Sequence, residues 1–179
     1  YEGAKYKSFD TREEAERALA TSPYAYIGKN AKKKSEKVSS ETLPACVIDN
    51  SLAVDAACSG NPGPMEYRGV HIASRQEVFH FGPTKGTNNI GEFLAIVHGL
   101  ALLKQKEFDM PIYSDSVNAI SWVRQKKCKT KLPRTAETEE LFKLIERAEK
   151  WLRENTYTTR ILKWETKEWG EIPADFGRK

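Results

Sequence analysis

Several features that would place a chain in a common class are missing from this sequence. No run of about 18 uncharged apolar residues occurs, so no segment is long enough to form a membrane-spanning helix. No charged segment followed by an apolar one resembles a signal peptide. We therefore expect a cytoplasmic protein, with no membrane partner, and nothing in the sequence indicates an obligate protein partner.

Cysteine and histidine are also scarce. The three cysteines are odd in number and form no CxxC pair, which argues against a disulfide framework or a zinc site. The three histidines show no metal-ligand spacing with one another. We predict reduced thiols, structural or surface histidines, and no histidine chemistry.

What remains is an ordinary globular composition, with 39% hydrophobic and 30% charged residues. The net charge is only +4, but the lysines are clustered. Residues 29–44 are polar and basic, and we predict a flexible linker there. Residues 124–134 are also rich in Lys and Arg, but they lie between two predicted helices. This second run would be held in a fixed place, where it could contact the phosphates of a polyanion.

These changes in composition divide the chain into three parts. Residues 1–28 contain a short alternating segment and then a helix that opens with Thr11 and Glu14 in capping-box spacing. The basic linker follows. Residues 45–179 have the size of a typical single domain.

Within this domain, hydrophobic periodicity predicts three strands first and then an alternation of strands and helices. The second and third strands are separated by a short polar turn, as in a hairpin. This order is typical of an α/β protein with a mixed sheet covered by helices. The predicted strands are 52–58, 67–74, 77–82, 110–115 and 160–166, and the predicted helices are 91–105, 116–125, 135–155 and a final turn within 171–179.

Four acidic residues fall at the ends of these elements, where ligands gather in open sheets. Asp55 lies in an apolar strand, Glu92 near the start of a long helix, Asp115 at the end of the fourth strand, and Asp175 beyond the last strand. Each has a structural alternative when taken alone. Glu92 and Asp175 could complement helix dipoles, Asp115 could cap a helix, and Asp55 could be a hydrogen-bonded core carboxylate.

Asp55 is the hardest of the four to explain structurally. An ionised carboxylate in a buried strand is costly unless a positive group pairs with it, and no basic residue adjoins Asp55 in the sequence. Magnesium would offset this cost, because it binds carboxylate oxygens and keeps positions for water and phosphate. Two such ions, about 4 Å apart, can hold the attacking and leaving oxygens of a phosphodiester. A fifth acid, Glu171, stands four residues before Asp175.

Four segments, in this order and spacing, resemble the acidic motifs of type 1 ribonuclease H. They read VDAACSGNPGPMEYRG, GTNNIGEFLAIVHGL, IYSDSVNAISWV and KWETKEWGEIPADFGRK. The resemblance covers residues 50–179 and implies a ribonuclease H-like fold, in which a five-stranded mixed sheet, three antiparallel strands and then parallel strands, is flanked by helices. It also implies hydrolysis of the RNA strand of an RNA/DNA hybrid with two Mg²⁺ ions, leaving 5′-phosphate and 3′-hydroxyl ends; Mn²⁺ is the alternative metal.

The family's metal ligands carry over onto Asp55, Glu92, Asp115 and Asp175. The resemblance implies that Asp55 contacts both ions and that Glu92 also contacts the RNA. Many members carry a histidine before the last aspartate, but this chain has none there. It resembles the histidine-lacking bacterial members, in which a glutamate takes that place, so Glu171 is the candidate. The alternative is that Glu171 is an exposed loop acid.

Recognition of a hybrid depends on sugars, since the wide minor groove of such a duplex displays little sequence. The resemblance assigns sugar and phosphate contacts to polar residues near the acids, and it places Trp122 against a deoxyribose. Turn formation is the structural alternative for the asparagines, and Trp122 could be a core residue. Val117 stands where many members have a glutamine. The predicted contacts are Asn61, Thr87, Asn88, Asn89, Ser116, Trp122, Thr130 and Lys131.

Residues 1–28 resemble the second half of a hybrid-binding, viroplasmin-like domain, with Tyr6 and Lys7 on its nucleic-acid face. The first half is missing, so we do not expect this segment to bind a hybrid independently. Two other functions stay open: a ribonuclease H-like DNA nuclease or strand transferase, and a non-catalytic hybrid-binding module. The order of the motifs favours the ribonuclease over the first, and the presence of four mutually repelling acids counts against the second.

Overall fold

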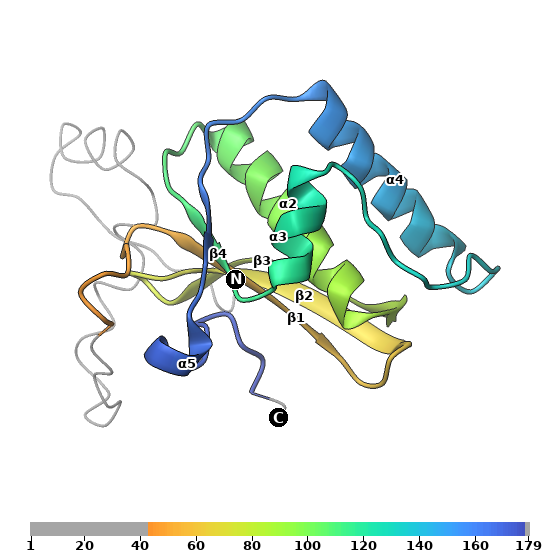
Figure 1. Ribbon diagram of the computed structural model, residues 1–179, viewed down its shortest axis with the longest axis horizontal. Helices are drawn as coiled ribbons and strands as arrows, with labels where there is room; N and C mark the ends of the chain where they lie inside the picture. Colours follow the sequence, from red (N-terminus) through yellow and green to blue (C-terminus); the bar gives the residue numbers. More distant parts are fainter. Residues whose placement is uncertain (1–42, 178–179) are drawn as a thin grey trace, which may run out of the picture.

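The computed structural model describes residues 43–177 (Figure 1). The predicted hybrid-binding segment with Tyr6 and Lys7, and nearly all of the predicted linker, lie outside the described residues. The strands are β1 (Leu52–Cys58), β2 (Gly63–His71), β3 (Gln76–Gly86), β4 (Ile112–Ser114) and β5 (Ile161–Lys163). The helices are α2 (Asn88–Lys106), α3 (Val117–Arg124), α4 (Glu139–Glu154) and α5 (Thr166–Trp169).

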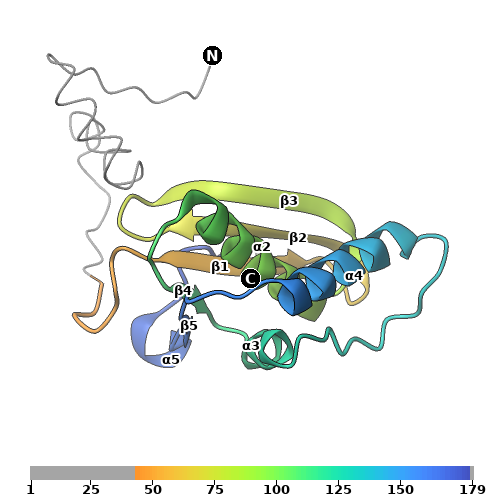
Figure 2. The ribbon, with the colours of Figure 1, turned by 90° about the horizontal axis from the view of Figure 1, so that it is seen from above.

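The five strands form one sheet in the order β3-β2-β1-β4-β5, which can be followed in Figure 2. Strands β1, β2 and β3 pair antiparallel, whereas β4 runs parallel to β1 and β5. The mixed sheet predicted from the sequence is therefore confirmed. The hairpin strands are longer than predicted, because the Gly/Pro segments at their ends favour turns locally but pair here, Pro64 with Lys85 for example.

Side-chain caps fix the starts of two helices. The Thr87 hydroxyl accepts a hydrogen bond from the Ile90 N–H at 3.3 Å, so α2 begins three residues before its predicted start. Ser116 caps α3, as predicted, by accepting from the Ala119 N–H at 3.1 Å. Helix α4 begins later than predicted, since residues 135–138 form a turn.

The prediction of a helical turn within 171–179 is wrong for the described residues, which are irregular from 171 to 177. The last helix is α5, and it occupies the end of the strand predicted at 160–166. Gly170 ends α5 with φ of 78°, and Pro173 has no N–H to donate to a following helical turn. The loop that carries Asp175 therefore takes its shape from tertiary contacts.

Two cores lie on opposite faces of the sheet. Helices α2, α3 and α4 cover one face and bury the larger core against it, while α5 lies on the other side (Figures 1 and 2). Strand β1 contributes Val54 and Ala56 to the larger core and Ala53 to the smaller one. The smaller core also contains Ile172 and Ala174, which hold the C-terminal loop against the sheet.

The other sequence expectations concern single residue types. The three cysteines are free thiols, and each of the three histidines binds a protein side chain, as expected for structural histidines. In residues 43–177, no helix combines the length and the apolar character needed to cross a membrane.

Helix α2 approaches β1 most closely at Gly91. A Cβ atom on this residue would lie 2.8 Å from the Ala56 Cβ and 2.8 Å from the Met65 Sδ, closer than van der Waals contact permits. The next residue along the helix is Glu92. The missing side chain of Gly91 thus lets the helix bring Glu92 to the sheet.

We expect Gly91→Ala to destabilise the protein by about 1–3 kcal/mol through overpacking. This cost outweighs the helix preference of alanine over glycine, which is about 1 kcal/mol. Denaturant unfolding measures the change. Gly99→Ala, in the same helix, is the matched comparison and should cost less, because its Cβ would meet the ends of the Ile112 and Leu52 side chains at 3.0 Å and not another Cβ atom at 2.8 Å. A Gly91→Ala protein as stable as the wild type would contradict the close approach.

Candidate functional site

The site lies where the sheet opens between β1 and β4. The register of β4 with β1 covers only Leu52 and Ala53, since β4 is three residues long. Beyond this point the Ala56 N–H donates to the Glu92 Oε1 at 3.1 Å. The Glu92 carboxylate of α2 thus accepts the backbone hydrogen bond that a carbonyl of a neighbouring strand would otherwise accept.

Three of the predicted acids meet at this opening. Asp55 comes from the middle of β1, Glu92 from the second turn of α2, and Asp115 from the residue after β4. Each offers a carboxylate oxygen, and the three oxygens lie within 4.8 Å of one another. Asp55 is 6% exposed and Glu92 only 2%. Residues far apart in the sequence therefore form one compact acidic cluster.

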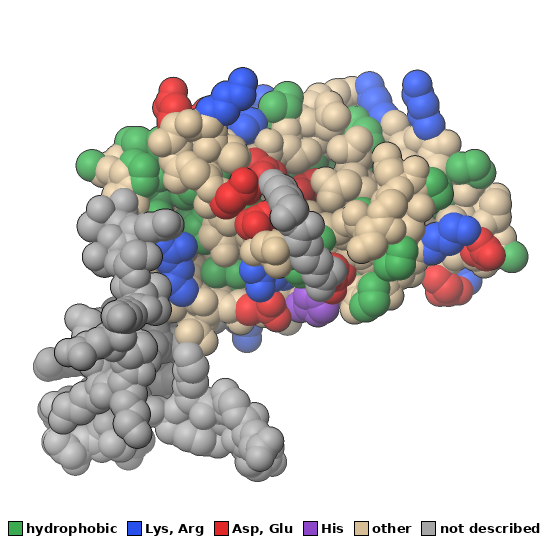
Figure 3. All heavy atoms as spheres, turned by 90° about the horizontal axis from the view of Figure 1, so that it is seen from below, with side chains coloured by type: hydrophobic (Ala, Val, Ile, Leu, Met, Phe, Trp, Pro, Cys, Tyr) green, Lys and Arg blue, Asp and Glu red, His purple; other side chains and the backbone are tan. Residues whose placement is uncertain are grey.

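Asp175, the fourth predicted acid, reaches the same place from the C-terminal loop. It lines a cavity of about 460 Å³ together with the other three acids. The space-filling view shows a group of acidic side chains near the middle of one face and basic side chains toward its rim (Figure 3). The lining residues are Asp55, Ala56, Ala57, Cys58, Ser59, Asn88, Glu92, Asp115, Ser116 and Asp175.

Burial and mutual repulsion raise the pKa values of two of these acids, Asp55 and Glu92. Burial raises the pKa of Asp55 to about 6, and the charges of Asp115 and Asp175 add to this rise. Burial also raises the pKa of Glu92 well above its usual value, with the charge of Asp55 as the next cause. Without a cation, the cluster disfavours full ionisation.

A divalent cation fits this donor set. The Glu92 Oε2 is a buried atom with no hydrogen-bond partner, and such an atom calls for an explanation. Clustered carboxylate oxygens are the ligands that magnesium and similar hard cations prefer. Within residues 43–177, this is the one group of three or more His, Cys, Asp or Glu side chains able to hold a metal ion.

The structural alternatives for three of the acids do not hold. Glu92 lies outside the first turn of α2, and no helix follows Asp175 among the described residues. The cap of α3 is Ser116, so Asp115 has no capping role there. These positions are better explained by their convergence at the opening of the sheet.

The predicted nucleic-acid contacts are distributed unevenly around the cavity. Asn88 and Ser116 line it. Asn61 and Asn89 are exposed, in the β1–β2 turn and in the first turn of α2 respectively. The Thr87 and Thr130 hydroxyls accept local backbone hydrogen bonds, and these bonds define the cap of α2 and a turn after α3.

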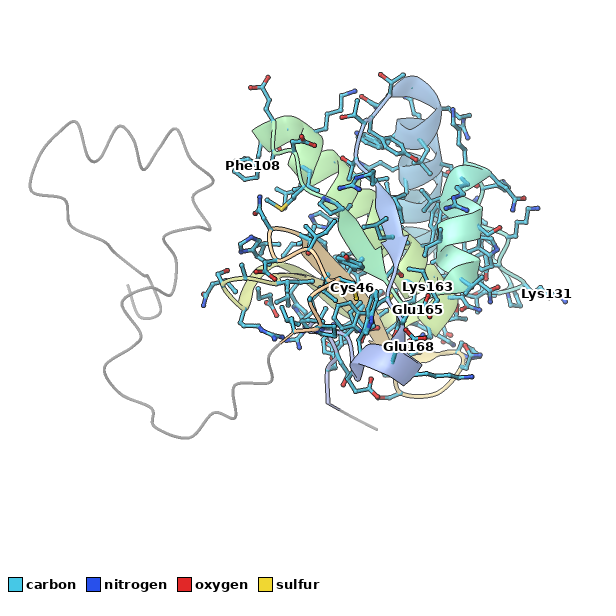
Figure 4. All side chains as sticks on the ribbon, turned by 60° about the vertical axis from the view of Figure 1, so that its left-hand side comes forward. Cys46, Phe108, Lys131, Lys163, Glu165 and Glu168 are labelled. Carbon is cyan, nitrogen blue, oxygen red and sulfur yellow. The ribbon has the colours of Figure 1, made fainter. Side chains whose placement is uncertain are left out.

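The remaining predicted residues lie farther out. Trp122 is partly buried and packs edge-on against Phe93, with 6.4 Å between the ring centroids, so the core interpretation holds in part. Lys131 is exposed and extends outward from the loop between α3 and α4 (Figure 4). Glu171 is exposed and is not among the residues that line the cavity. Val117, on the first turn of α3, is 66% exposed.

The basic run 124–134 is anchored, as the sequence predicted. The buried Glu149 carboxylate of α4 accepts from the Cys128 N–H at 3.1 Å and pairs with the Lys127 Nζ at 3.2 Å. These contacts hold the run between α3 and α4.

Sequence reasoning missed two features of the site. One is the Ala56 N–H that binds Glu92, and the other is Arg68, which stands directly opposite Asp55 on β2. The predicted second strand began at residue 67, whereas β2 begins at Gly63 and its pairing with β1 starts at Met65, so the sequence did not give the register that places Arg68 opposite Asp55. Its guanidinium binds the backbone of the C-terminal loop.

Comparison with known proteins gives one family. The model of the family described as RNase H matches residues 49–165, which include Asp55, Glu92 and Asp115 but neither Glu171 nor Asp175. A ribonuclease H of Desulforamulus reducens is 37% identical over 92 residues, covering 43% of this chain and 57% of that protein. A ribonuclease H of a Sulfurovum species is 39% identical over 85 residues, covering 42% and 56%.

The chain thus spans about half the length of these relatives. Among solved structures, an RNase H1 isolated from compost aligns with a TM-score of 0.44 and 17% identity. That alignment covers 66% of this chain and 87% of the other.

Proposed function

The chain belongs to the ribonuclease H family, and from this membership we propose that it hydrolyses the RNA strand of RNA/DNA hybrids. It would act as an endonuclease and leave 5′-phosphate and 3′-hydroxyl ends. The observation that carries the proposal is the convergence of Asp55, Glu92 and Asp115 in one buried cluster within the residues that match the family. The ribonucleases H named above support the same activity.

Magnesium is the proposed cofactor, with manganese as the alternative, and two ions would be held by Asp55, Glu92, Asp115 and Asp175. When bound, such a pair supplies an activated water and stabilises the leaving oxygen of a phosphodiester. The chain itself holds the ligands in place. Glu92 is fixed through one oxygen by the Ala56 N–H, which leaves its second oxygen for a cation. No protein nucleophile is needed.

The hybrid would lie across the cavity and contact the polar residues on either side of it. Asn88 and Ser116 lie closest to the acids, and the exposed Asn61 and Asn89 are able to reach sugars in a minor groove. The partly exposed Trp122 would pack on a deoxyribose. We assign Thr87, Thr130 and Lys131 to phosphate contacts, supported by the anchored basic run.

We further assign the chain to the histidine-lacking type of the family. The sequence has no histidine after His98, so none precedes Asp175 in its loop. Glu171, an exposed acid in that loop, is the proposed substitute and would assist product release.

One gel tests this function. Labelled RNA/DNA hybrid, double-stranded RNA and double-stranded DNA of one sequence are incubated with the full chain, each with and without Mg²⁺. We expect cleavage of the RNA strand of the hybrid only, and only with the metal. Equal cutting of duplex DNA would indicate a DNA nuclease or strand transferase, and binding of the hybrid without cutting would indicate a non-catalytic module. Either outcome contradicts the proposal.

A further inference from the structure

Arg68 connects strand β2 to the loop that carries Asp175. Its Nε donates to the Ala174 carbonyl at 2.7 Å, and its Nη2 donates to the Asp175 carbonyl at 2.6 Å. The guanidinium also lies over the Phe176 ring, 4.7 Å from its centroid. One side chain therefore holds three consecutive residues of the loop.

The loop that carries Asp175 has no regular secondary structure to fix its position. Residues 171–177 form no helix or strand, and α5 before them is only four residues long. Ile172 and Ala174 are buried in the smaller core, but this packing anchors the chain before Asp175. The bonds within the loop are short-range: the Asp175 N–H donates to the Ile172 carbonyl at 2.8 Å, and the Gly177 N–H donates to the Asp175 Oδ2 at 2.9 Å.

The position of Arg68 makes these bonds relevant to the acidic cluster. In the β1–β2 register, Arg68 is the direct cross-strand partner of Asp55. Asp175 in turn lies close enough to Asp55 for its charge to raise the pKa of Asp55. Arg68 therefore links the two acids. Its backbone lies on β2 opposite Asp55, and its guanidinium binds the backbone carbonyl of Asp175.

We propose that Arg68 is a positioning residue that holds Asp175 beside Asp55 in the acidic cavity, so that the fourth acid is in place before a cation binds. The inference rests on the proposed function. Hydrogen bonds from a guanidinium are charge-assisted, and the planar fork fixes two acceptors at once in a defined geometry. The fourth contact of the guanidinium, at 3.5 Å to the exposed Glu77 carboxylate, adds little, because exposed ion pairs are weak.

Arg68→Met removes both loop bonds and keeps an apolar stem of similar length. We expect amide hydrogen exchange at residues 174–177 of the metal-free protein to rise by about tenfold or more, since bonds to charged groups are the stronger ones. The Mg²⁺ concentration for half-maximal cleavage should rise about 10- to 100-fold, the usual effect of losing a group that orients a metal ligand. The turnover number should fall while the KM for the hybrid changes less.

Arg68→Lys keeps the charge but replaces the fork by one ammonium group, so intermediate changes are expected in both measurements. If thermal unfolding shows that Arg68→Met is not folded, Arg68→Lys replaces it as the test variant. Arg153→Met is the matched control, because it removes an exposed arginine from the last turn of α4, away from the loop. It should behave as the wild type.

Wild-type exchange at residues 174–177 together with a wild-type Mg²⁺ requirement in Arg68→Met would overturn the proposal. The same result in Arg68→Lys, if only that variant folds, would also overturn it. The exchange measurement needs neither metal nor substrate. If the wild-type chain does not cut the hybrid, the proposed function fails, and exchange still decides whether Arg68 fixes the loop.

Discussion

Replacing Asp115 with asparagine is expected to reduce cleavage of an RNA/DNA hybrid by at least about 10³-fold, or about 4 kcal/mol in activation free energy. Asparagine keeps the shape of the side chain but removes one of three carboxylates whose oxygens lie within 4.8 Å of one another. The cluster would then hold its cations with one fewer anionic ligand. Single-turnover cleavage at saturating enzyme measures the effect without a contribution from product release.

A measurement of thermal stability distinguishes this loss of activity from unfolding of the variant. Removal of one charge from a group of mutually repelling acids should leave the melting temperature of the metal-free protein unchanged or higher. Asp109→Asn is the matched control, because Asp109 is an exposed acid just after α2 and does not line the acidic cavity. It should cleave as the wild type does. A loss of less than about tenfold in Asp115→Asn would contradict its role as a metal ligand.

The second large effect is a loss of stability in the metal-free protein as the pH rises from about 4 to above 6. A carboxyl group whose pKa is raised by folding binds its proton more tightly in the folded state. Its contribution is therefore complete below the unfolded pKa and is lost as the pH rises through the folded pKa. For Asp55, a rise to about 6 corresponds to roughly 3 kcal/mol. Glu92 acts in the same direction and extends the loss to higher pH.

Denaturant unfolding in EDTA between pH 4 and 8 measures this loss, and Asp55→Asn provides the comparison. The variant lacks one of the two titrating groups, so the difference between the two stability curves reports the titration of Asp55 together with its effect on the pKa of Glu92. Saturating Mg²⁺ should restore more stability at pH 8 than at pH 5, because the ligands must be deprotonated to bind it. Parallel curves for the wild type and Asp55→Asn would show that burial does not perturb Asp55.

Local hydrophobic periodicity predicted most of the helices and strands correctly, as helix α4 illustrates. The helical spacing of six apolar residues predicted the buried side of α4: Leu141, Leu144, Ile145, Ala148, Trp151 and Leu152. Four of them are buried, and Leu144 and Trp151 are half-buried. The ends of elements were less predictable. Gly/Pro segments were interpreted as turns although the hairpin strands extend through them, and a helix was predicted after Gly170 where Pro173 and the smaller core determine an irregular path.

The acids of the candidate site could be predicted from residue type and position in the sequence. The residues that hold them in place could not, because their roles depend on strand pairing and tertiary contacts. An acid in an apolar strand identified Asp55, and the ends of elements identified the other three. The hydrogen bond from Ala56 to Glu92 and the hydrogen bonds from Arg68 to the C-terminal loop join residues far apart in the sequence. They depend on strand register and tertiary packing, which hydrophobic periodicity does not predict. The helix cap at Thr87 is a local feature, and its hydroxyl, which accepts the Ile90 N–H, keeps its own hydrogen for the proposed phosphate contact.

The shortness of β4 has a consequence for how this domain balances stability against function. Each further residue of β4 paired with β1 would add backbone hydrogen bonds to the sheet, and a sheet selected for stability alone would gain from them. The first such bonds would occupy the edge from which Ala56 holds Glu92, and the added strand would fill the space where the carboxylates meet. The missing hydrogen bonds are thus a stability cost of keeping the site open, and the proposed function would constrain the length of β4.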